Sequence, residues 1–593
     1  MVINIQDDIL KIHSFGLLDK LLLDKTTAHR IMWATDAYSA LGPQYERNEE
    51  IASELITGSN AGVIKTRARK EMEQQSSRTR QHGEVSTPLW VCQKMCDYFD
   101  EVWDREASWQ KYVDAKVLEI TCGEAPFLVS RYDVETGEAI PIPERIGLLD
   151  RKLRVVGENA QDEAEWLEWA VRAFQAAYGF EIQGDNVLIA RVNLLMTFGE
   201  YLRDRWKREP TEAEWRQIVN IITWNIWQMD GLSGTVPCGT AEREKPQPNC
   251  LIFNWRGAQI AEYQSLQQKK ERALKFDCII GNPPYQEADG GSGASAKPIY
   301  NKFTESVKRL SPEVLSLIIP AKWYSGGKGL DGFRREMLHD PCISRLVDYT
   351  DSTDCFPGVD VAGGICYFVW DKNFNGKCSY TNNYRGITTT VERDLGEYDT
   401  LIRYPVAVSI IAKVKALHEI TLDHTVSSRK PFGLDTKVRP ALSGDIELRY
   451  NGGIGPFRRT DIKTGADMID RWKIIISYLT AEHAGQPDRN GQFRIVSTME
   501  KLRPQTVCSE TYLVAGAFDT QAEADNFMLY LKTRFARFLL AQIAVTQHIS
   551  RAAFAFVPAQ DFTKPTSDPE LYRKYHLTEE EISFMERMIK KMD

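Results

Sequence analysis

A short apolar run that ends in two prolines constrains this chain more than any other feature. Residues 278–280 (Cys-Ile-Ile) are typical of a short strand buried on both faces, and Gly281-Asn282-Pro283-Pro284-Tyr285 follows directly. Proline lacks a backbone N–H, so it cannot continue the hydrogen-bond ladder of a central strand. The sequence therefore predicts a rigid turn at the end of a central strand, which displays the amide of Asn282 and the ring of Tyr285.

This turn suits a substrate that carries an amino group. The Asn282 side-chain oxygen and the Pro283 carbonyl can each accept one hydrogen of an exocyclic amine, which draws the nitrogen towards tetrahedral geometry and frees its lone pair. Tyr285 can stack on the base that carries the amine. The alternative is an ordinary surface turn, because Asn-Pro commonly starts one. The buried strand before it favours the functional interpretation.

A second strand end is predicted within residues 115–128, where an apolar run passes through a loop of small residues into a helix. In a doubly wound sheet, nucleotide-like ligands bind at such a strand end. Gly123 and Ala125 allow the backbone to approach a ligand, and the carboxylate of Glu119 suits an ammonium or hydroxyl group. Because the loop lacks a full Gly-x-Gly, it favours a cationic cofactor without phosphate. An ordinary strand-to-helix turn is the alternative.

Further acidic residues follow other strand-like runs. Glu181 ends a short strand, where such folds hold ribose hydroxyls, and Asp150 is its weaker competitor. Asp185 is expected to cap the helix that follows Glu181. Asp230 precedes Gly231, and it either accepts a hydrogen from an adenine amine or makes a turn.

Strands alternate with helices between about residues 115 and 370, which predicts an α/β fold with a Rossmann-like sheet. Residues 1–80 are expected to form an N-terminal helical region, and residues 81–375 the domain that contains this sheet. Thr87 and Pro88 predict that a helix starts near the beginning of this second region. Residues 376–593 are expected to form a mixed α+β domain with C-terminal helices.

Short β-like segments with interleaved basic and aromatic residues open this C-terminal part. Residues 428–432 (Ser-Arg-Lys-Pro-Phe) and 455–459 (Gly-Pro-Phe-Arg-Arg) are examples. Such residues in loops suit contacts to a nucleic-acid backbone and to bases, and a generic β surface is the alternative.

Composition limits the class of protein. A chain of 593 residues is too long for one core, and its net charge of −8 argues against binding nucleic acid through bulk charge, although a basic cleft on an acidic body stays possible. No apolar run approaches the roughly 20 residues of a membrane span, and the N-terminus does not resemble a secretion signal. The eleven cysteines are scattered without paired Cys-x-x-Cys units, so we expect a cytoplasmic protein with free thiols and no metal site.

Taken together, these motifs resemble those of the S-adenosylmethionine-dependent N6-adenine DNA methyltransferases of bacterial restriction–modification systems, in their gamma arrangement. There the cofactor motifs precede Asn-Pro-Pro-Tyr and a target-recognition domain follows. The matching residues are Thr87 in the helix-start motif, Glu119, Thr121, Cys122 and Gly123 in the first cofactor motif, Glu181 and Asp230 as the ribose and adenine acids, and Asn282, Pro283, Pro284 and Tyr285 as the catalytic motif. Two departures are Ile120, where the family usually has proline, and Glu124-Ala125, which replaces the second glycine.

The resemblance implies a site-specific enzyme that uses S-adenosylmethionine, flips an adenine out of double-stranded DNA and methylates it at N6. It also implies a modification component that can work with a separate restriction endonuclease subunit. Several alternatives stay open: a fusion with its own nuclease activity, a non-catalytic DNA-specificity subunit, and an enzyme that methylates RNA or protein glutamine. A nucleotide-binding oxidoreductase is disfavoured, because the loop that follows the first predicted strand has no Gly-x-Gly-x-x-G.

Overall fold

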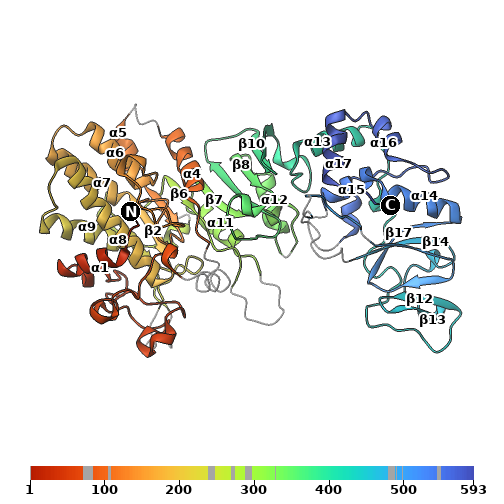
Figure 1. The fold of residues 1–593 in the computed structure, drawn as a ribbon, viewed down its shortest axis with the longest axis horizontal. Helices are drawn as coiled ribbons and strands as arrows, with labels where there is room; N and C mark the ends of the chain where they lie inside the picture. Colours follow the sequence, from red (N-terminus) through yellow and green to blue (C-terminus); the bar gives the residue numbers. More distant parts are fainter. Residues whose placement is uncertain are drawn as a thin grey trace. The chain divides into compact units, whose positions relative to one another are not determined.

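The computed structural model describes residues 2–70, 85–103, 108–237, 247–268, 274–287, 297–327, 329–478, 488, 491–496, 498–543 and 549–592. It divides into two compact units (Figure 1). The first comprises residues 1–320, 340–360 and 365–380, and the second comprises residues 321–339, 361–364 and 381–593. Within the described residues, no helix is both long enough and apolar enough to cross a bilayer.

A mostly parallel sheet organises the first unit, which confirms the predicted α/β class. Its strand order is β10-β8-β9-β7-β6-β1-β2-β3, and β11 follows beyond β10 in the second unit. The five neighbours from β7 to β3 are parallel, and β9 runs antiparallel to both β7 and β8. The strands are β1 (Val117–Ile120), β2 (Ala177–Glu181), β3 (Ile226–Gln228), β6 (Cys278–Gly281), β7 (Val314–Pro320), β8 (Ile343–Tyr349), β9 (Ile365–Asp371), β10 (Cys378–Tyr384) and β11 (Ile387–Arg393).

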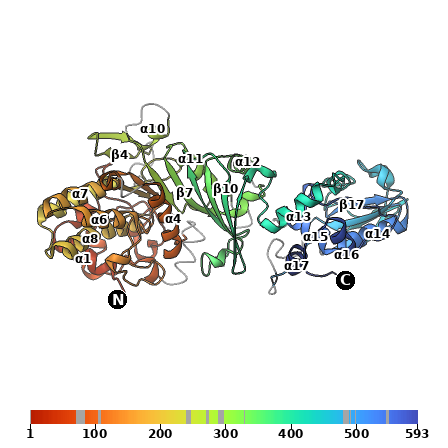
Figure 2. The ribbon, with the colours of Figure 1, turned by 90° about the horizontal axis from the view of Figure 1, so that it is seen from above.

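Every residue of β1, β2, β6 and β7 is buried, as expected for parallel strands covered on both faces. The long interval between the first cofactor motif and Glu181 is explained by two helices, α6 and α7, which pack together within the crossover from β1 to β2 (Figure 2). The helices of this unit are α1 (Ile5–Ser14), α2 (Leu18–Leu21), α4 (Leu89–Val102), α5 (Trp109–Asp114), α6 (Leu148–Asn159), α7 (Glu163–Gln175), α8 (Gly184–Trp206), α9 (Glu212–Asn225), α10 (Tyr263–Gln267) and α11 (Tyr300–Lys308), and a hairpin of β4 (Leu251–Asn254) and β5 (Gln259–Glu262) precedes β6.

Hydrogen bonds from α8 and from the end of β3 hold the N-terminal residues in place. The buried guanidinium of Arg191, on α8, donates through Nη1 to the carbonyls of Leu21 (2.6 Å) and Leu23 (3.0 Å). The side chain of Gln228, at the end of β3, accepts from the backbone N–H of Met32 and donates to its carbonyl, both at 2.8 Å. Because these contacts satisfy backbone groups of a segment with little regular structure, they fix its position.

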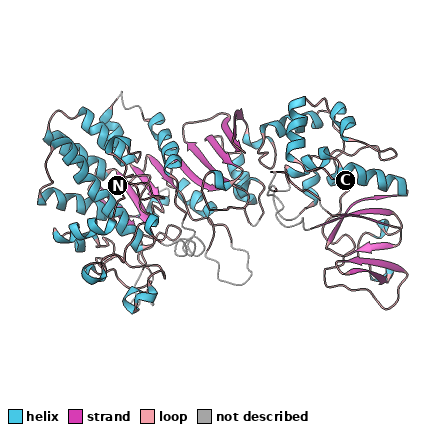
Figure 3. Cartoon of the chain, viewed as in Figure 1, coloured by secondary structure: helices cyan, strands magenta, loops and turns pink. Residues whose placement is uncertain are grey.

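The second unit is mixed α+β, as predicted for the C-terminal part (Figure 3). Two three-stranded sheets, β13-β12-β16 and β15-β14-β17, pack with helices around apolar cores. The elements are α12 (Asp331–Leu338), α13 (Pro405–Lys415), β12 (Ile446–Tyr450), β13 (Gly453–Phe457), β14 (Trp472–Ser477), β15 (Met499–Leu502), β16 (Thr506–Cys508), β17 (Tyr512–Phe518), α14 (Gln521–Lys532), α15 (Arg534–Ala541), α16 (Asp568–Lys574) and α17 (Glu579–Met588).

Replacing Gly184 with alanine tests this docking. Its backbone N–H donates to the Trp33 carbonyl at 3.0 Å, and an added Cβ would lie 1.8 Å from the Met32 carbonyl oxygen. We expect Gly184→Ala to lower the free energy of unfolding by about 3 kcal/mol in urea titrations, because the segment must move. Gly157→Ala, in α6, is the control: its Cβ would meet nothing closer than 3.9 Å, and the change should add up to about 1 kcal/mol. Equal effects of the two changes would contradict the prediction.

Candidate active site

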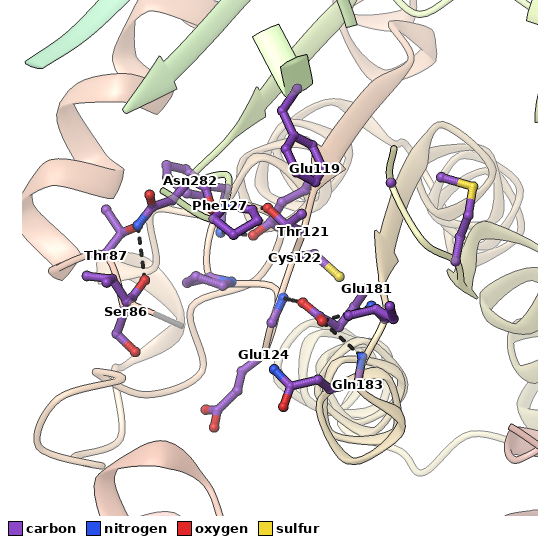
Figure 4. Close-up of a pocket in the computed structure, with 18 of the residues that line it drawn as sticks. Ser86, Thr87, Glu119, Thr121, Cys122, Glu124, Phe127, Glu181, Gln183 and Asn282 are labelled. Atoms are coloured by element: carbon purple, nitrogen blue, oxygen red, sulfur yellow. Dashed lines mark hydrogen bonds between the residues drawn. The ribbon is translucent and has the colours of Figure 1, made fainter. Parts of the chain in front are cut away.

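A cavity of about 260 Å³ lies at the carboxyl ends of β6, β1, β2 and β3 (Figure 4). Because these strands are parallel, the residues that follow them meet at one edge of the sheet. Nine of the eleven residues that the sequence predicted for the site line the cavity; Pro283 and Tyr285 do not. The nine are Thr87, Glu119, Thr121, Cys122, Gly123, Glu181, Asp230, Asn282 and Pro284.

The amide of Asn282 is held in one orientation. Its Nδ2 donates to the Val85 carbonyl at 3.0 Å and to the Thr87 hydroxyl at 3.1 Å (Figure 4). Since a carbonyl only accepts hydrogen bonds, the amide nitrogen must face Val85. Asn282 Oδ1 is buried and has no hydrogen-bond partner among the described residues. Asn282 lines the cavity, and the described residues leave its amide oxygen without a donor; that this oxygen accepts a substrate hydrogen stays a prediction.

Thr87 has a contact that sequence reasoning missed. Helix α4 begins at Leu89 with Pro88 as its N-cap and without a side-chain cap bond, so the predicted helix start is present. The Thr87 hydroxyl instead accepts the hydrogen bond from Asn282, which lies 195 residues further along the chain. No local pattern in the sequence signals such a pairing.

Tyr285 lies in the core next to the cavity. Its side chain is 9% exposed, and its hydroxyl has no hydrogen-bond partner of acceptable geometry among the described residues. Burial raises the pKa of this hydroxyl well above its usual range, and the nearby side chain of Asn282 opposes part of the shift. The ring belongs to the same turn as Asn282 but does not form part of the cavity wall.

The loop after β1 has an unusual backbone. Thr121, Gly123 and Ala125 have φ angles of 45°, 53° and 63°, in the left-handed region. This conformation costs about 1–2 kcal/mol for a residue with a Cβ, and such strain is concentrated at functional sites. Ala125, one of the two departures from the family motif, therefore keeps the backbone that glycine adopts readily. The hydroxyl of Thr121 donates to the main-chain carbonyl of Asn282 at 3.0 Å, so the loop is joined to the turn that follows β6.

Two carboxylates shape this loop through backbone hydrogen bonds. Glu119, which is buried, accepts from the N–H groups of Phe127 (3.4 Å) and Leu128 (3.0 Å). Glu181 accepts from Gly123 at 3.0 Å through Oε2, and its Oε1 accepts from the two residues that follow it in the chain. A carboxylate has about four acceptor sites, so Glu181 can also accept a hydroxyl hydrogen. The sequence placed both carboxylates correctly at the cavity but gave no sign of their backbone partners.

Asp230 makes the turn that was one of its two interpretations, and its role towards an adenine amine stays a prediction. Its Oδ1 accepts from the N–H groups of Leu232 (2.8 Å) and Ser233 (3.2 Å), which makes a tight turn, and the residue also lines the cavity. The competitor Asp150 accepts from Ser130 and is not among the cavity residues.

Asp185 does not cap α8, so that expectation is wrong. The N-cap of α8 is Gln183. Asp185 Oδ2 instead accepts from the Tyr38 hydroxyl (2.8 Å) and pairs with Lys70 Nζ (3.2 Å), and both carboxylate and ammonium are buried. The carboxylate therefore joins the N-terminal region to α8.

Comparison with known proteins identifies the central part of the chain. Residues 175–356 match the family described as the Eco57I restriction-modification methylase. Over these residues the chain is similar to that family. The match contains Glu181, Asp230 and the turn of residues 281–285, and it begins beyond Thr87 and the loop after β1. A methylase family implies a methyl donor.

A relative of this chain is an uncharacterized adenine-specific methylase of Mycoplasma pneumoniae. It is 35% identical over 136 residues, which cover 22% of this chain and 32% of the relative. This chain therefore spans about a third of that relative's length.

Solved structures also resemble the chain. The restriction-modification enzyme MmeI in complex with DNA is 10% identical, with 82% of this chain and 69% of that chain covered and a TM-score of 0.42. The type IIG restriction endonuclease BpuSI is 10% identical, with 96% and 72% covered and a TM-score of 0.38. Similarity at this level does not bear on activity.

The pH dependence of the free energy of unfolding should reveal the raised pKa of the Glu119 carboxyl. Burial raises the pKa of its carboxyl well above the usual range, although the two backbone N–H groups oppose this. A carboxyl with a higher pKa in the folded state adds stability at low pH, which is lost as the pH rises through the folded-state pKa. Between about pH 5 and 8, the free energy of unfolding should fall relative to Glu119→Gln, by at most about 1.4 kcal/mol per pH unit.

Urea titrations at several pH values measure this difference. The exposed Glu168, on α7, provides the matched control, because Glu168→Gln removes a carboxyl that is in contact with water. Parallel pH profiles for the wild type and Glu119→Gln would contradict the prediction.

Proposed function

We propose that this chain is a site-specific DNA adenine N6-methyltransferase that uses S-adenosylmethionine, and that it is the modification component of a restriction–modification system. The observation that carries the proposal is the buried Oδ1 of Asn282, which has no hydrogen-bond partner among the described residues. Asn282 and the loop after β1 line the same cavity. An acceptor that is fixed and unpartnered at this point is ready for an amine hydrogen.

The residues of the cavity fit S-adenosylmethionine. Glu119, Glu124, Glu181 and Asp230 surround it with carboxyl groups, which suit a sulfonium and an ammonium. A Cβ added to Gly123 would meet nothing within 4 Å, so the loop leaves open space for a ligand. In this proposal, Glu181 holds the ribose hydroxyls, Asp230 the adenine amine, and the backbone from Thr121 to Gly123, with Cys122, lies along the amino-acid part. When bound, the cofactor supplies an electrophilic methyl group on a sulfonium.

The chain's own contribution to the reaction is positioning. Asn282 Oδ1 and the Pro283 carbonyl accept the two N6 hydrogens of a flipped adenine, and Pro284 keeps the turn rigid. The Val85 carbonyl and the Thr87 hydroxyl hold the Asn282 amide so that its oxygen cannot rotate away. Tyr285 stacks on the base, which requires its buried ring to become accessible when the base enters. No general base is needed before attack, because the amine becomes acidic only once it is methylated.

Double-stranded DNA is the proposed substrate, and a separate restriction endonuclease subunit is a proposed partner in the cytoplasm. The basic residues predicted as DNA contacts in the second unit are largely ion-paired. Arg429 and Lys430 lie 3.2 and 3.6 Å from the carboxylate of Glu510, and Arg459 pairs with Asp470. To contact phosphate, these residues must give up their ion pairs with carboxylates. They are therefore less suited to be the main contacts to DNA.

Transfer of a labelled methyl group from S-adenosylmethionine to DNA tests the function directly. We expect N6-methyladenine as the product, and Asn282→Ala should lower kcat by about 10²-fold or more, because a positioned acceptor is lost. Cofactor binding by calorimetry should be retained. The exposed Asn373→Ala serves as the control and should keep full activity. Full activity in Asn282→Ala would refute the assigned role.

The hydroxyl of Thr87 has a separable role. Thr87→Val keeps the shape but removes the acceptor for Asn282 Nδ2, so kcat should fall by about tenfold, the effect of one lost hydrogen bond. Thr87→Ser keeps the hydroxyl and should restore most of kcat. Single-turnover assays beside cofactor titrations separate the two roles. Weaker cofactor binding in Thr87→Val with an unchanged kcat would show that Thr87 acts on the cofactor instead.

A further inference from the structure

We propose that Arg67, which belongs to the N-terminal region and not to the sheet, binds the carboxylate at the amino-acid end of the methyl donor. This inference rests on the proposed function, since it concerns the same cavity. Arg67 lies outside the Eco57I-family match and outside every motif that the sequence revealed. It would make the N-terminal region part of the cofactor site.

The charges around the cavity motivate the assignment. Four carboxyl residues line the cavity. Among the described residues that line it, Arg67 is the one basic residue. S-adenosylmethionine carries a sulfonium, an ammonium and a carboxylate. The acidic cavity attracts the first two groups and repels the third, which needs a cation close by. A guanidinium matches a carboxylate with two parallel hydrogen bonds, which adds geometric specificity to the charge.

The position of Arg67 agrees with this role. Its backbone N–H donates to Glu124 Oε1 at 2.6 Å, so Arg67 lies beside the loop after β1. Asp230 follows β3, which is separated from β1 by β2. With the adenine at Asp230 and the ribose at Glu181, the amino-acid end of the donor extends towards the loop after β1, where Arg67 lies.

The segment that carries Arg67 is anchored on both sides of it. Glu124 Oε2 accepts from the Tyr132 hydroxyl at 2.7 Å, and Asn193 Nδ2, from α8, donates to both the Tyr132 hydroxyl and the Glu124 carbonyl at 3.0 Å. Three residues after Arg67, the buried pair of Lys70 and Asp185 fixes the chain again. A cation on a segment fixed in this way loses little freedom on binding, which favours affinity.

This network also explains the second departure from the family motif. Glu124 stands in a loop that is glycine-rich in the family. Its carboxylate accepts a hydrogen bond from the backbone of the N-terminal region, which glycine could not do because it has no side chain. The substitution therefore couples the loop to Arg67 without removing the left-handed backbone at Ala125.

The test compares two ligands that differ only in the carboxylate. S-adenosylmethionine and decarboxylated S-adenosylmethionine are titrated calorimetrically into the full-length protein, so the readout is binding and not activity. The wild type should bind the carboxylated ligand about 10- to 100-fold more tightly. Arg67→Ala should abolish this preference and leave the affinity for the decarboxylated ligand within about twofold. Arg67→Lys should retain an intermediate preference, because it keeps the charge but loses the paired geometry.

Arg69→Ala is the matched control. Arg69 lies in the same short turn, is exposed, and donates to Asn4 and not into the cavity. It should bind both ligands as the wild type does. Equal losses for both ligands in Arg67→Ala, or no loss for either, would overturn the proposal. A wild type that binds neither ligand would overturn the proposed function itself, and the inference with it.

Discussion

The candidate site depends on two hydrogen bonds, which the Asn282 amide donates to the Val85 carbonyl and to the Thr87 hydroxyl. Both hydrogens of the amide are used, and the buried oxygen has no hydrogen-bond partner among the described residues. These hydrogen bonds require that β6 ends close to β1. Gly281 makes this possible, because a Cβ there would lie 2.6 Å from the Ile120 carbonyl oxygen. Any larger residue at position 281 would push the turn away from the loop that it faces.

The sequence predicts the sheet and the site for one shared reason. Buried parallel strands consist of continuous apolar runs, and the polar residues that follow each run must meet at one edge of the sheet. Glu119 and Glu181 lie within the last residues of such runs, and Asp230 and Asn282 follow such runs. All four therefore line one cavity. Tyr285 differs because strand ends fix where a turn lies, but not which way each side chain of that turn points.

Contacts between distant segments could not be predicted in the same way. Arg67 and Glu124 are 57 residues apart, and Lys70 and Asp185 are 115 apart. In each case one side chain meets a group of a segment without regular periodicity, so neither partner stands out in the sequence. The basic residues of the second unit illustrate the same limit. Arg429 and Lys430 form a local positive pattern, but Glu510, far along the chain, lies close to both and offsets one of the two positive charges.

The electrostatics of the cavity decide between classes of cofactor. A phosphate-bearing cofactor needs cations or a series of free backbone N–H groups, as a glycine-rich loop supplies. Here the N–H of Gly123 is bonded to Glu181, and those of Phe127 and Leu128 are bonded to Glu119. Even without the buried Glu119, the three acidic residues Glu124, Glu181 and Asp230 against one arginine would repel a diphosphate. The same arrangement attracts a ligand with two positive groups and a single carboxylate, so the site favours a sulfonium donor over a dinucleotide.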